Sequence, residues 1–287
     1  MIGKLNAALV LVLVAGCAHE PPTFYPSIAD KGHLVLIGGG PKPADVVQLY
    51  VDLAGGPNAN IVVLPLASED SREAGADYID LFRAHGAGRV TVVQIDDRRD
   101  AYRAEYARII GEATGVFFSG GDQSRIASRI VDTPILDAVR SVKARGGVVG
   151  GTSAGTACES DVMLTGAGDE STLAPHNMVV SRGIGLFEGV IVDSHFVARR
   201  RFTRLQSVVL EHPELLGIGV DEGTAAWVKP DGTMEVRGLG TVVVYDASRA
   251  TTSVRNGKFV APGMSTYSLT AGQQFDLRGR QVPASKL

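Results

Sequence analysis

The sequence predicts an α/β protein with a mostly parallel sheet, helices on both faces of that sheet, and a β-rich C-terminal extension. Three patterns indicate this fold: short apolar runs, amphipathic segments between them, and glycine-containing turns after several runs. Strands that are apolar throughout are typical of parallel sheets buried between helices. The composition is 45% hydrophobic and 21% charged, which excludes a disordered chain, and the formal net charge of −3 gives no reason to expect nucleic acid as a partner.

Predicted strands and helices alternate through the first half of the chain. Short apolar runs predict strands at 34–37, 61–66, 90–95, 115–119 and 148–149. Helical spacing predicts helices at 44–53, 72–84, 101–110, from 123 onward, and again through 139–144. Right-handed crossovers bring the carboxyl ends of parallel strands to one edge. We expect a site at that edge, because the glycine-containing turns at 38–40, 120–121 and 150–151 all follow predicted strands.

The pattern changes after residue 238. Short extended segments with turns and no helix follow at 242–245, 258–261, 265–269 and 274–277. We therefore expect an α/β domain at 31–238 and a β-rich extension at 239–287. The residues before them are expected to form a signal peptide at 1–16 and a polar tether at 17–30.

The N-terminal residues are typical of a bacterial lipoprotein signal. Lys4 precedes an apolar run at 7–16, which is too short to span a bilayer and which ends in Val14-Ala15-Gly16-Cys17. We expect export and lipidation of Cys17, so that the chain meets a membrane only through this anchor. Ala18, rather than Asp, favours the outer membrane; a plain signal peptide followed by secretion is the alternative. Lipidation would leave Cys158 without a cysteine partner, in the role of a small buried side chain.

One pentapeptide predicts a nucleophile. Gly151-Thr152-Ser153-Ala154-Gly155 matches G-x-S-x-G between a predicted strand and a predicted helix. A sharp strand-to-helix turn strains the central residue and needs glycine on both sides. We therefore interpret Ser153 as the nucleophile of a hydrolase. The alternative is a structural glycine turn.

An oxyanion hole needs backbone donors near that serine. The N–H of Ala154 follows the nucleophile directly. The loop Ser119-Gly120-Gly121-Asp122-Gln123 follows a neighbouring predicted strand and offers a second donor from Gly120 or Gly121. The alternative for this loop is a tight turn with Asp122 as the N-cap of a helix.

His195 is the favoured general base. It follows the apolar run at 189–192, within Asp193-Ser194-His195-Phe196, and so lies at a strand end like Ser153. His176 is the alternative. A carboxylate should fix the imidazole tautomer, and Glu170 lies between nucleophile and base in the chain. Its neighbour Asp169 competes for this role.

Four segments together resemble the cyanophycinase family, a serine-peptidase group related to aspartyl dipeptidase (peptidase E). They are Ser119–Gln123, Gly151–Gly155, Asp193–Phe196 with the arginines after it, and Gly217–Ala225, over roughly residues 32 to 230. The resemblance implies the sheet of class I glutamine amidotransferases and a triad of Ser153, His195 and Glu170. It also implies a substrate groove lined by Gln123, Asp193, Arg199, Arg201 and Arg204.

By this resemblance the substrate is cyanophycin, a poly-aspartate with arginine on its side chains, and the product is the β-Asp-Arg dipeptide. The guanidinium groups of arginine can bind the carboxylates of such a polymer through two parallel hydrogen bonds. Asp193 would hold a substrate guanidinium. The chain departs from the family at Ser194, where Gln is common, at Phe202-Thr203, where small residues are usual, and at Gly223, which replaces a residue that is often acidic.

Cleavage of short aspartyl or isoaspartyl peptides is the alternative within the same class. A non-catalytic binding lipoprotein is the alternative from another class. We expect no cofactor and no metal, and the resemblance suggests a homodimer.

Overall fold

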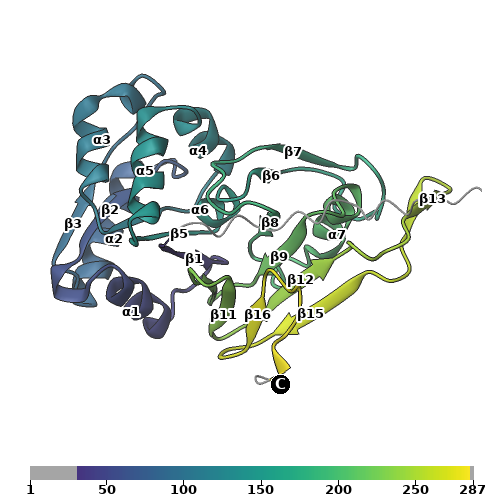
Figure 1. Cartoon of the computed structure of the whole chain (residues 1–287). Helices are drawn as coiled ribbons and strands as arrows, with labels where there is room; N and C mark the ends of the chain where they lie inside the picture. The colour runs from purple at the N-terminus through teal and green to yellow at the C-terminus, as the bar shows by residue number, and fades with distance from the viewer. Residues whose placement is uncertain (1–30, 285–287) are drawn as a thin grey trace, which may run out of the picture.

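A twisted sheet of eight strands forms one half of the molecule in the computed structural model, which describes residues 31–284 (Figure 1). Its order is β16-β11-β10-β1-β5-β4-β2-β3. Five neighbouring strands are parallel: β1 (His33–Ile37), β5 (Val148–Thr152), β4 (Gly115–Phe118), β2 (Asn60–Leu64) and β3 (Arg89–Val92). Three antiparallel strands complete it: β10 (Thr224–Val228), β11 (Thr233–Gly238) and β16 (Gln274–Asp276).

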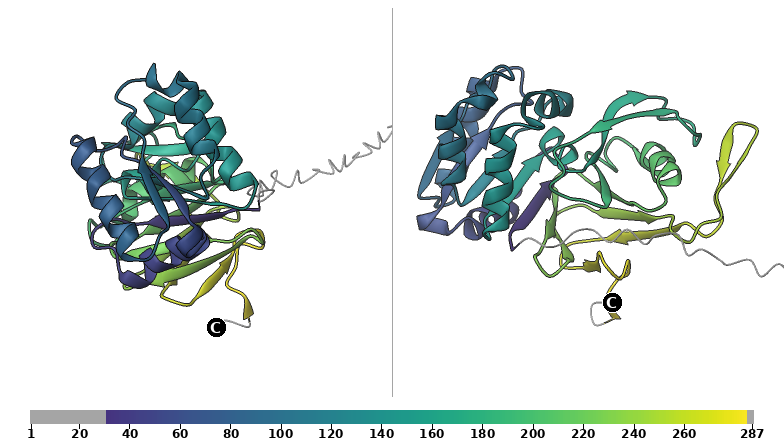
Figure 2. Two further views of the ribbon diagram at one scale, coloured as in Figure 1. Left: turned by 90° about the vertical axis from the view of Figure 1, so that its left-hand side faces the viewer. Right: turned by 45° about the horizontal axis from the view of Figure 1, so that its top comes forward.

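Helices cover both faces of the parallel strands, as the apolar runs predict (Figure 2). Successive residues of a strand point to opposite faces of the sheet, so each strand contributes side chains to both cores. Val35 and Ile37 pack in one core with helices α1 (Ala44–Leu53) and α2 (Ser71–Ala84). Leu34 and Leu36 pack in the other core with α3 (Ala104–Gly111), α4 (Gln123–Ile130) and α5 (Pro134–Ala144). The short helices η1 (Gly56–Asn58) and η2 (Asp100–Tyr102) lie between these elements.

A second sheet of four strands, in the order β15-β12-β9-β8, forms the other half. It combines β8 (Val190–Asp193), β9 (Leu216–Val220), β12 (Val242–Asp246) and β15 (Ser265–Leu269), with α7 (Phe202–Glu211) packed against it. The hairpin of β6 (Val162–Gly168) and β7 (Met178–Arg182) lies beside β8, and the hairpin of β13 (Ser253–Arg255) and β14 (Lys258–Val260) extends from the body (Figure 1). Helix α6 (Ala154–Ala157) follows β5.

The predicted fold class is confirmed, including the strand-rich region after residue 238. These later strands enter both sheets, since β12 lies between β15 and β9, while β16 pairs with β11. The expected signal peptide, tether and lipidated Cys17 lie outside the described residues, and the division into domains stays a prediction. Within residues 31–284, every helix is too short or too polar to cross a bilayer. Cys158 is fully buried, and its thiol donates to the Gly155 carbonyl at 3.3 Å.

Candidate active site

Ser153 occupies a strained turn between β5 and α6. Its backbone angles are φ 56° and ψ −111°, a conformation that costs a non-glycine residue free energy and persists only where the surroundings impose it. The flanking glycines permit the turn, because a Cβ on Gly151 would lie 2.4 Å from the carbonyl carbon of Gly155. The Ser153 N–H donates to the Ile37 carbonyl at 3.0 Å, which ties the turn to β1.

Among the described residues, backbone N–H groups without a partner lie in the segments next to Ser153. Helix α6, which follows the serine, has only four residues and so forms a single helical turn. Within residues 31–284, the N–H groups of Ala154, Gly120 and Gly121 donate to no protein acceptor. A Cβ on Gly120 would lie 3.4 Å from the Cβ of Ser153, so this loop runs directly beside the serine. Ala154 and Gly120 are thus placed to offer donors to an oxyanion on a carbonyl attacked by Ser153.

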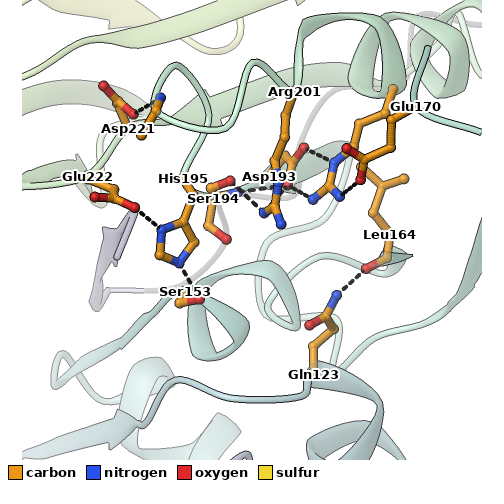
Figure 3. A network of polar contacts seen from close by, with 12 residues as sticks. Gln123, Ser153, Leu164, Glu170, Asp193, Ser194, His195, Arg201, Asp221 and Glu222 are labelled. Carbon is orange, nitrogen blue, oxygen red and sulfur yellow. Dashed lines mark hydrogen bonds and ion pairs between the residues drawn. The ribbon is translucent and has the colours of Figure 1, made fainter. Parts of the chain in front are cut away.

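His195 lies in the loop after β8 and meets Ser153 from the second sheet. Its Nε2 is 2.8 Å from the Ser153 Oγ (Figure 3). The backbone N–H of His195 donates to the Gly38 carbonyl at 2.7 Å. The end of β1 also presses against the imidazole, because a Cβ on Gly39 would lie 2.5 Å from Nε2. The absence of a side chain at Gly39 therefore permits the observed position of the ring.

Glu222 orients the imidazole. Its Oε1 lies 2.6 Å from the His195 Nδ1, so the carboxylate accepts the Nδ1 proton and leaves Nε2 free to accept one from Ser153 (Figure 3). Asp221 fixes the same loop by accepting the backbone N–H groups of Val197 and Ala198 at 3.0 and 2.9 Å. Two neighbouring carboxylates thus hold the imidazole of the base and the backbone that follows it.

The prediction that Glu170 orients His195 is wrong. The Glu170 Oε1 instead accepts from the Arg204 Nη1 at 2.5 Å. Asp169 accepts from Ser171, and the His176 side chain is 90% exposed and lies 3.5 Å from Glu211, so neither alternative enters the site.

Glu170 lies between Ser153 and His195 in the chain, whereas Glu222 follows both of them. Glu222 reaches the base through the pairing of β8 with β9, which brings the loop after Val220 beside the loop after Asp193 and which chain order does not predict. The available signal was a second apolar strand, 216–220, ending directly in Asp221-Glu222.

The surroundings of His195 favour a neutral imidazole. Burial lowers its pKa, the hydrogen bond that its ring donates to Glu222 raises it, and the nearby charge of Arg199 lowers it again, with a net shift below the usual 6.5. A base with a lowered pKa stays unprotonated, and able to accept the serine proton, at more acidic pH.

The arginines after His195 divide into buried and accessible groups. Arg204 is 2% exposed and donates from Nε and Nη2 to both carboxylate oxygens of Asp193 at 2.6 and 2.5 Å. Asp193 is itself 1% exposed, and its Oδ1 lies 3.5 Å from the Arg201 Nη1. The expectation that Asp193 holds a substrate guanidinium is therefore corrected: this carboxylate is buried and neutralised by two arginines of its own chain.

Arg199 and Arg201 line a small pocket of about 230 Å³ next to Ser153, and the largely buried Arg204 also contributes to its wall. Arg199 is exposed, and Arg201 is half-buried with its Nη1 donating to the Ser194 carbonyl at 2.8 Å. The Gln123 Nε2 donates to the Leu164 carbonyl at 2.7 Å, which leaves its amide oxygen free to accept (Figure 3). This pocket, lined in part by Gln123, Arg199 and Arg201, is called the arginine pocket below.

A larger pocket of about 550 Å³ lies on another side of Ser153. Both Ser153 and His195 line it, together with Gly120. The nucleophile therefore lies between two cavities, and only the larger one includes the imidazole in its wall. In the described part of the chain, no three His, Cys, Asp or Glu side chains converge as a metal site would require.

The profile of peptidase family S51 matches residues 34–236, which includes Ser153, His195 and Glu222. The chain belongs to peptidase family S51. It is a serine-type peptidase of the cyanophycinase-like kind.

A cyanophycinase of Synechococcus elongatus is 35% identical to this chain over 263 residues, covering 88% of the chain and 81% of the relative. The cyanophycinase of Geminocystis herdmanii is 35% identical over 237 residues, covering 80% and 86%. Among solved structures, a peptidase from an acI-B1 Actinobacterium aligns with a TM-score of 0.65 at 23% identity, over 85% of this chain and 96% of that one. A putative peptidase E protein from Listeria monocytogenes EGD-e aligns with a TM-score of 0.52 at 16% identity, over 73% and 99%. Both structural matches support the fold.

Proposed function

We propose that this S51 peptidase is an exported serine exopeptidase that hydrolyses cyanophycin to β-Asp-Arg dipeptides through an acyl-enzyme on Ser153. The observation that carries the proposal is the continuous hydrogen-bonded chain from Ser153 through His195 to Glu222, located between two pockets. A hydroxyl, a base and an orienting carboxylate in this order are what acyl transfer by a serine requires.

The proposed reaction follows from these contacts. The His195 Nε2 takes the Ser153 proton while the oxygen attacks the scissile carbonyl carbon, and Glu222 stabilises the imidazolium that forms. The negative charge on the carbonyl oxygen is met by the N–H groups of Ala154 and Gly120. As the carbon–nitrogen bond breaks, His195 returns the proton to the leaving amine. Water then attacks the ester with His195 again as base, and Ser153 is regenerated.

The arginine pocket supports a substrate rich in carboxylates. In cyanophycin each arginine is linked through its α-amino group, so its α-carboxylate stays free. Arg199 and Arg201 offer guanidinium groups to such a carboxylate, and guanidinium–carboxylate pairing favours two parallel hydrogen bonds. The buried Asp193–Arg204 pair holds α7 and the strand end in place beneath these groups.

The decisive experiment is to incubate the purified full chain with cyanophycin and, separately, with isoaspartyl dipeptides, and to follow the products by mass spectrometry. We expect β-Asp-Arg from the polymer and no product with the Ser153→Ala variant. Cleavage of the short dipeptides alone would contradict the proposed substrate and favour an isoaspartyl dipeptidase. Failure on both substrates, with no labelling of Ser153 by a serine-directed inhibitor, would favour a binding lipoprotein on the same fold.

We also propose that Cys17 is lipidated and that the protein acts at the cell envelope. The support is the sequence Val14-Ala15-Gly16-Cys17 after a short apolar run. An external enzyme suits a polymer that is too large to import before cleavage. Incorporation of labelled palmitate into the wild-type chain, and its loss in Cys17→Ser, is the expected result. An unlabelled wild-type chain recovered from the medium would contradict the anchor.

A further inference from the structure

The larger pocket beside Ser153 carries charged groups that the proposed chemistry does not use. Lys42 comes from the loop after β1, and Asp77 comes from α2, so the two side chains reach this cavity from separate elements. Within residues 31–284, neither side chain makes a hydrogen bond or ion pair with another protein group. The pocket therefore offers one cation and one anion to whatever enters it.

Lys42 is held in place from two directions. It lies between Pro41 and Pro43, and a residue before proline is restricted to extended conformations, so the loop has little backbone freedom here. Its Nζ lies 5.2 Å from the centre of the Tyr78 ring, within the range of a cation–π contact. Burial lowers the pKa of Lys42, while the charge of Asp77 raises it. This ammonium is thus positioned in the pocket and near a carboxylate that it does not contact directly.

Asp77 lies on the exposed side of the same cavity. The adjacent Tyr78 is buried and packs against Phe82 and Phe117, which anchors this turn of α2 to the sheet. Ala74 lines the pocket one helical turn before Asp77, and its small side chain leaves the space open. The carboxylate therefore stands at the rim of a cavity whose floor is fixed.

The position of His195 assigns this cavity to one side of the scissile bond. The imidazole must give its proton to the leaving amine, so the leaving group has to lie on the side that the ring faces. His195 lines the larger pocket and does not line the arginine pocket. The leaving part of the substrate is therefore directed toward Lys42 and Asp77, and the acyl part toward Arg199 and Arg201.

We propose that the larger pocket binds the leaving-group unit of the polymer, with Lys42 contacting the α-carboxylate of its arginine and Asp77 contacting its guanidinium. This inference rests on the proposed function, because a β-Asp-Arg unit on the leaving side carries both charges on one side chain. An isolated leaving amino acid would satisfy at most one of the two groups. The pocket thus selects for a chain of at least two units.

Two substrates separate leaving-group binding from chemistry. One is a dimer of β-Asp-Arg, and the other is an aspartic acid α-p-nitroanilide whose β-carboxyl carries arginine, so that its leaving group has no arginine. Lys42→Met should lower kcat/KM for the dimer about tenfold, and Asp77→Asn about threefold, as expected for a half-buried and an exposed charge. Neither variant should change kcat/KM for the anilide.

Matched controls and a modified substrate sharpen the assignment. Asp80 lies one turn further along α2, and Lys258 lies in an exposed hairpin. The variants Asp80→Asn and Lys258→Gln should therefore have the kcat/KM of the wild type on the dimer. A dimer with citrulline in the leaving unit lacks the guanidinium charge. Wild type should lose about threefold on it, and Asp77→Asn should lose nothing further, because the pair is already broken.

The outcomes distinguish the two proposals. Wild type that cleaves the dimer while Lys42→Met and Asp77→Asn do so normally overturns the leaving-group site and leaves the proposed function intact. Equal losses on dimer and anilide also overturn it, since the residues would then act on the acyl unit or on folding. Wild type that cleaves neither substrate overturns the proposed function and this inference with it.

Discussion

The nucleophile and its base are built by two different halves of the molecule. Ser153 is positioned by five consecutive residues at the end of a strand in the parallel sheet. His195 and Glu222 come from two separate strand ends of the second sheet and depend on the pairing of β8 with β9. The nucleophile is thus a local feature of the chain, whereas the oriented base is a product of tertiary structure. The end of β1 joins the halves, because Ile37 accepts from Ser153 and Gly38 accepts from His195.

Substitution of the nucleophile should have the largest effect on catalysis. Ser153→Ala should lower kcat by about 10⁶-fold, because a catalytic triad loses nearly all of its contribution when any essential member is removed. The free energy of unfolding should change little, since the strained backbone is retained. Turnover of cyanophycin and denaturant unfolding measure the two effects, and Ser128→Ala, at an exposed position of α4, is the control. Retention of substantial turnover by Ser153→Ala would refute the mechanism.

The orientation of the base by tertiary structure can be tested by comparing substitutions of Glu222 and Glu170. Glu222→Gln should lower kcat roughly 10³–10⁴-fold, because the amide favours the wrong tautomer of His195. Glu170→Gln should lower kcat less than about tenfold, since its partner is Arg204. Single-turnover kinetics of both variants decide between them. The opposite ranking would restore Glu170 as the orienting residue.

The junction between the halves is expected to be sensitive to a single methyl group. Gly39→Ala would place a Cβ 2.3 Å from the imidazole Cε1 and should lower kcat/KM about 10²-fold, by displacing the ring. Gly86→Ala is the matched control, because its φ of 85° is also positive and no atom lies within 4 Å of the added Cβ. Both variants should have a lower free energy of unfolding because of backbone strain. Only Gly39→Ala should also have a lower kcat/KM. Similar kcat/KM values for the two would contradict the contact.

The smallest effect concerns the charge around the base. Arg199→Ala should raise KM for the polymer about tenfold and should also raise the pKa of His195, because Arg199 holds that pKa down. Activity needs neutral His195 and is lost as pH falls through its pKa, so the acid limb of kcat/KM should move to higher pH in this variant. The neighbouring, exposed Arg200→Ala is the control for a change in net charge. An acid limb that moves equally in both variants would argue against the specific contact.

The sequence predicts the parts of this molecule that short stretches encode. Apolar runs predict the parallel strands, and the glycines around Ser153 predict the elbow because they stand next to the residue they serve. His195 is found because it follows closely after an apolar strand. Glu222 was missed because its proximity to His195 depends on which strands pair, and chain order does not contain that information. The assignment of Asp193 failed for a related reason: burial beneath Arg204 is invisible until α7 is packed against its sheet.

The division of the arginines into buried and exposed members has a consequence for ionic strength. Mobile ions screen charges that face water and have little access to a pair enclosed in protein. The Asp193–Arg204 pair is almost inaccessible, whereas Arg199 faces solvent. In concentrated salt the walls around Ser153 would therefore keep their shape while their attraction for an anionic polymer declined. Such an enzyme would release its substrate as salinity rises without losing the arrangement that cleaves it.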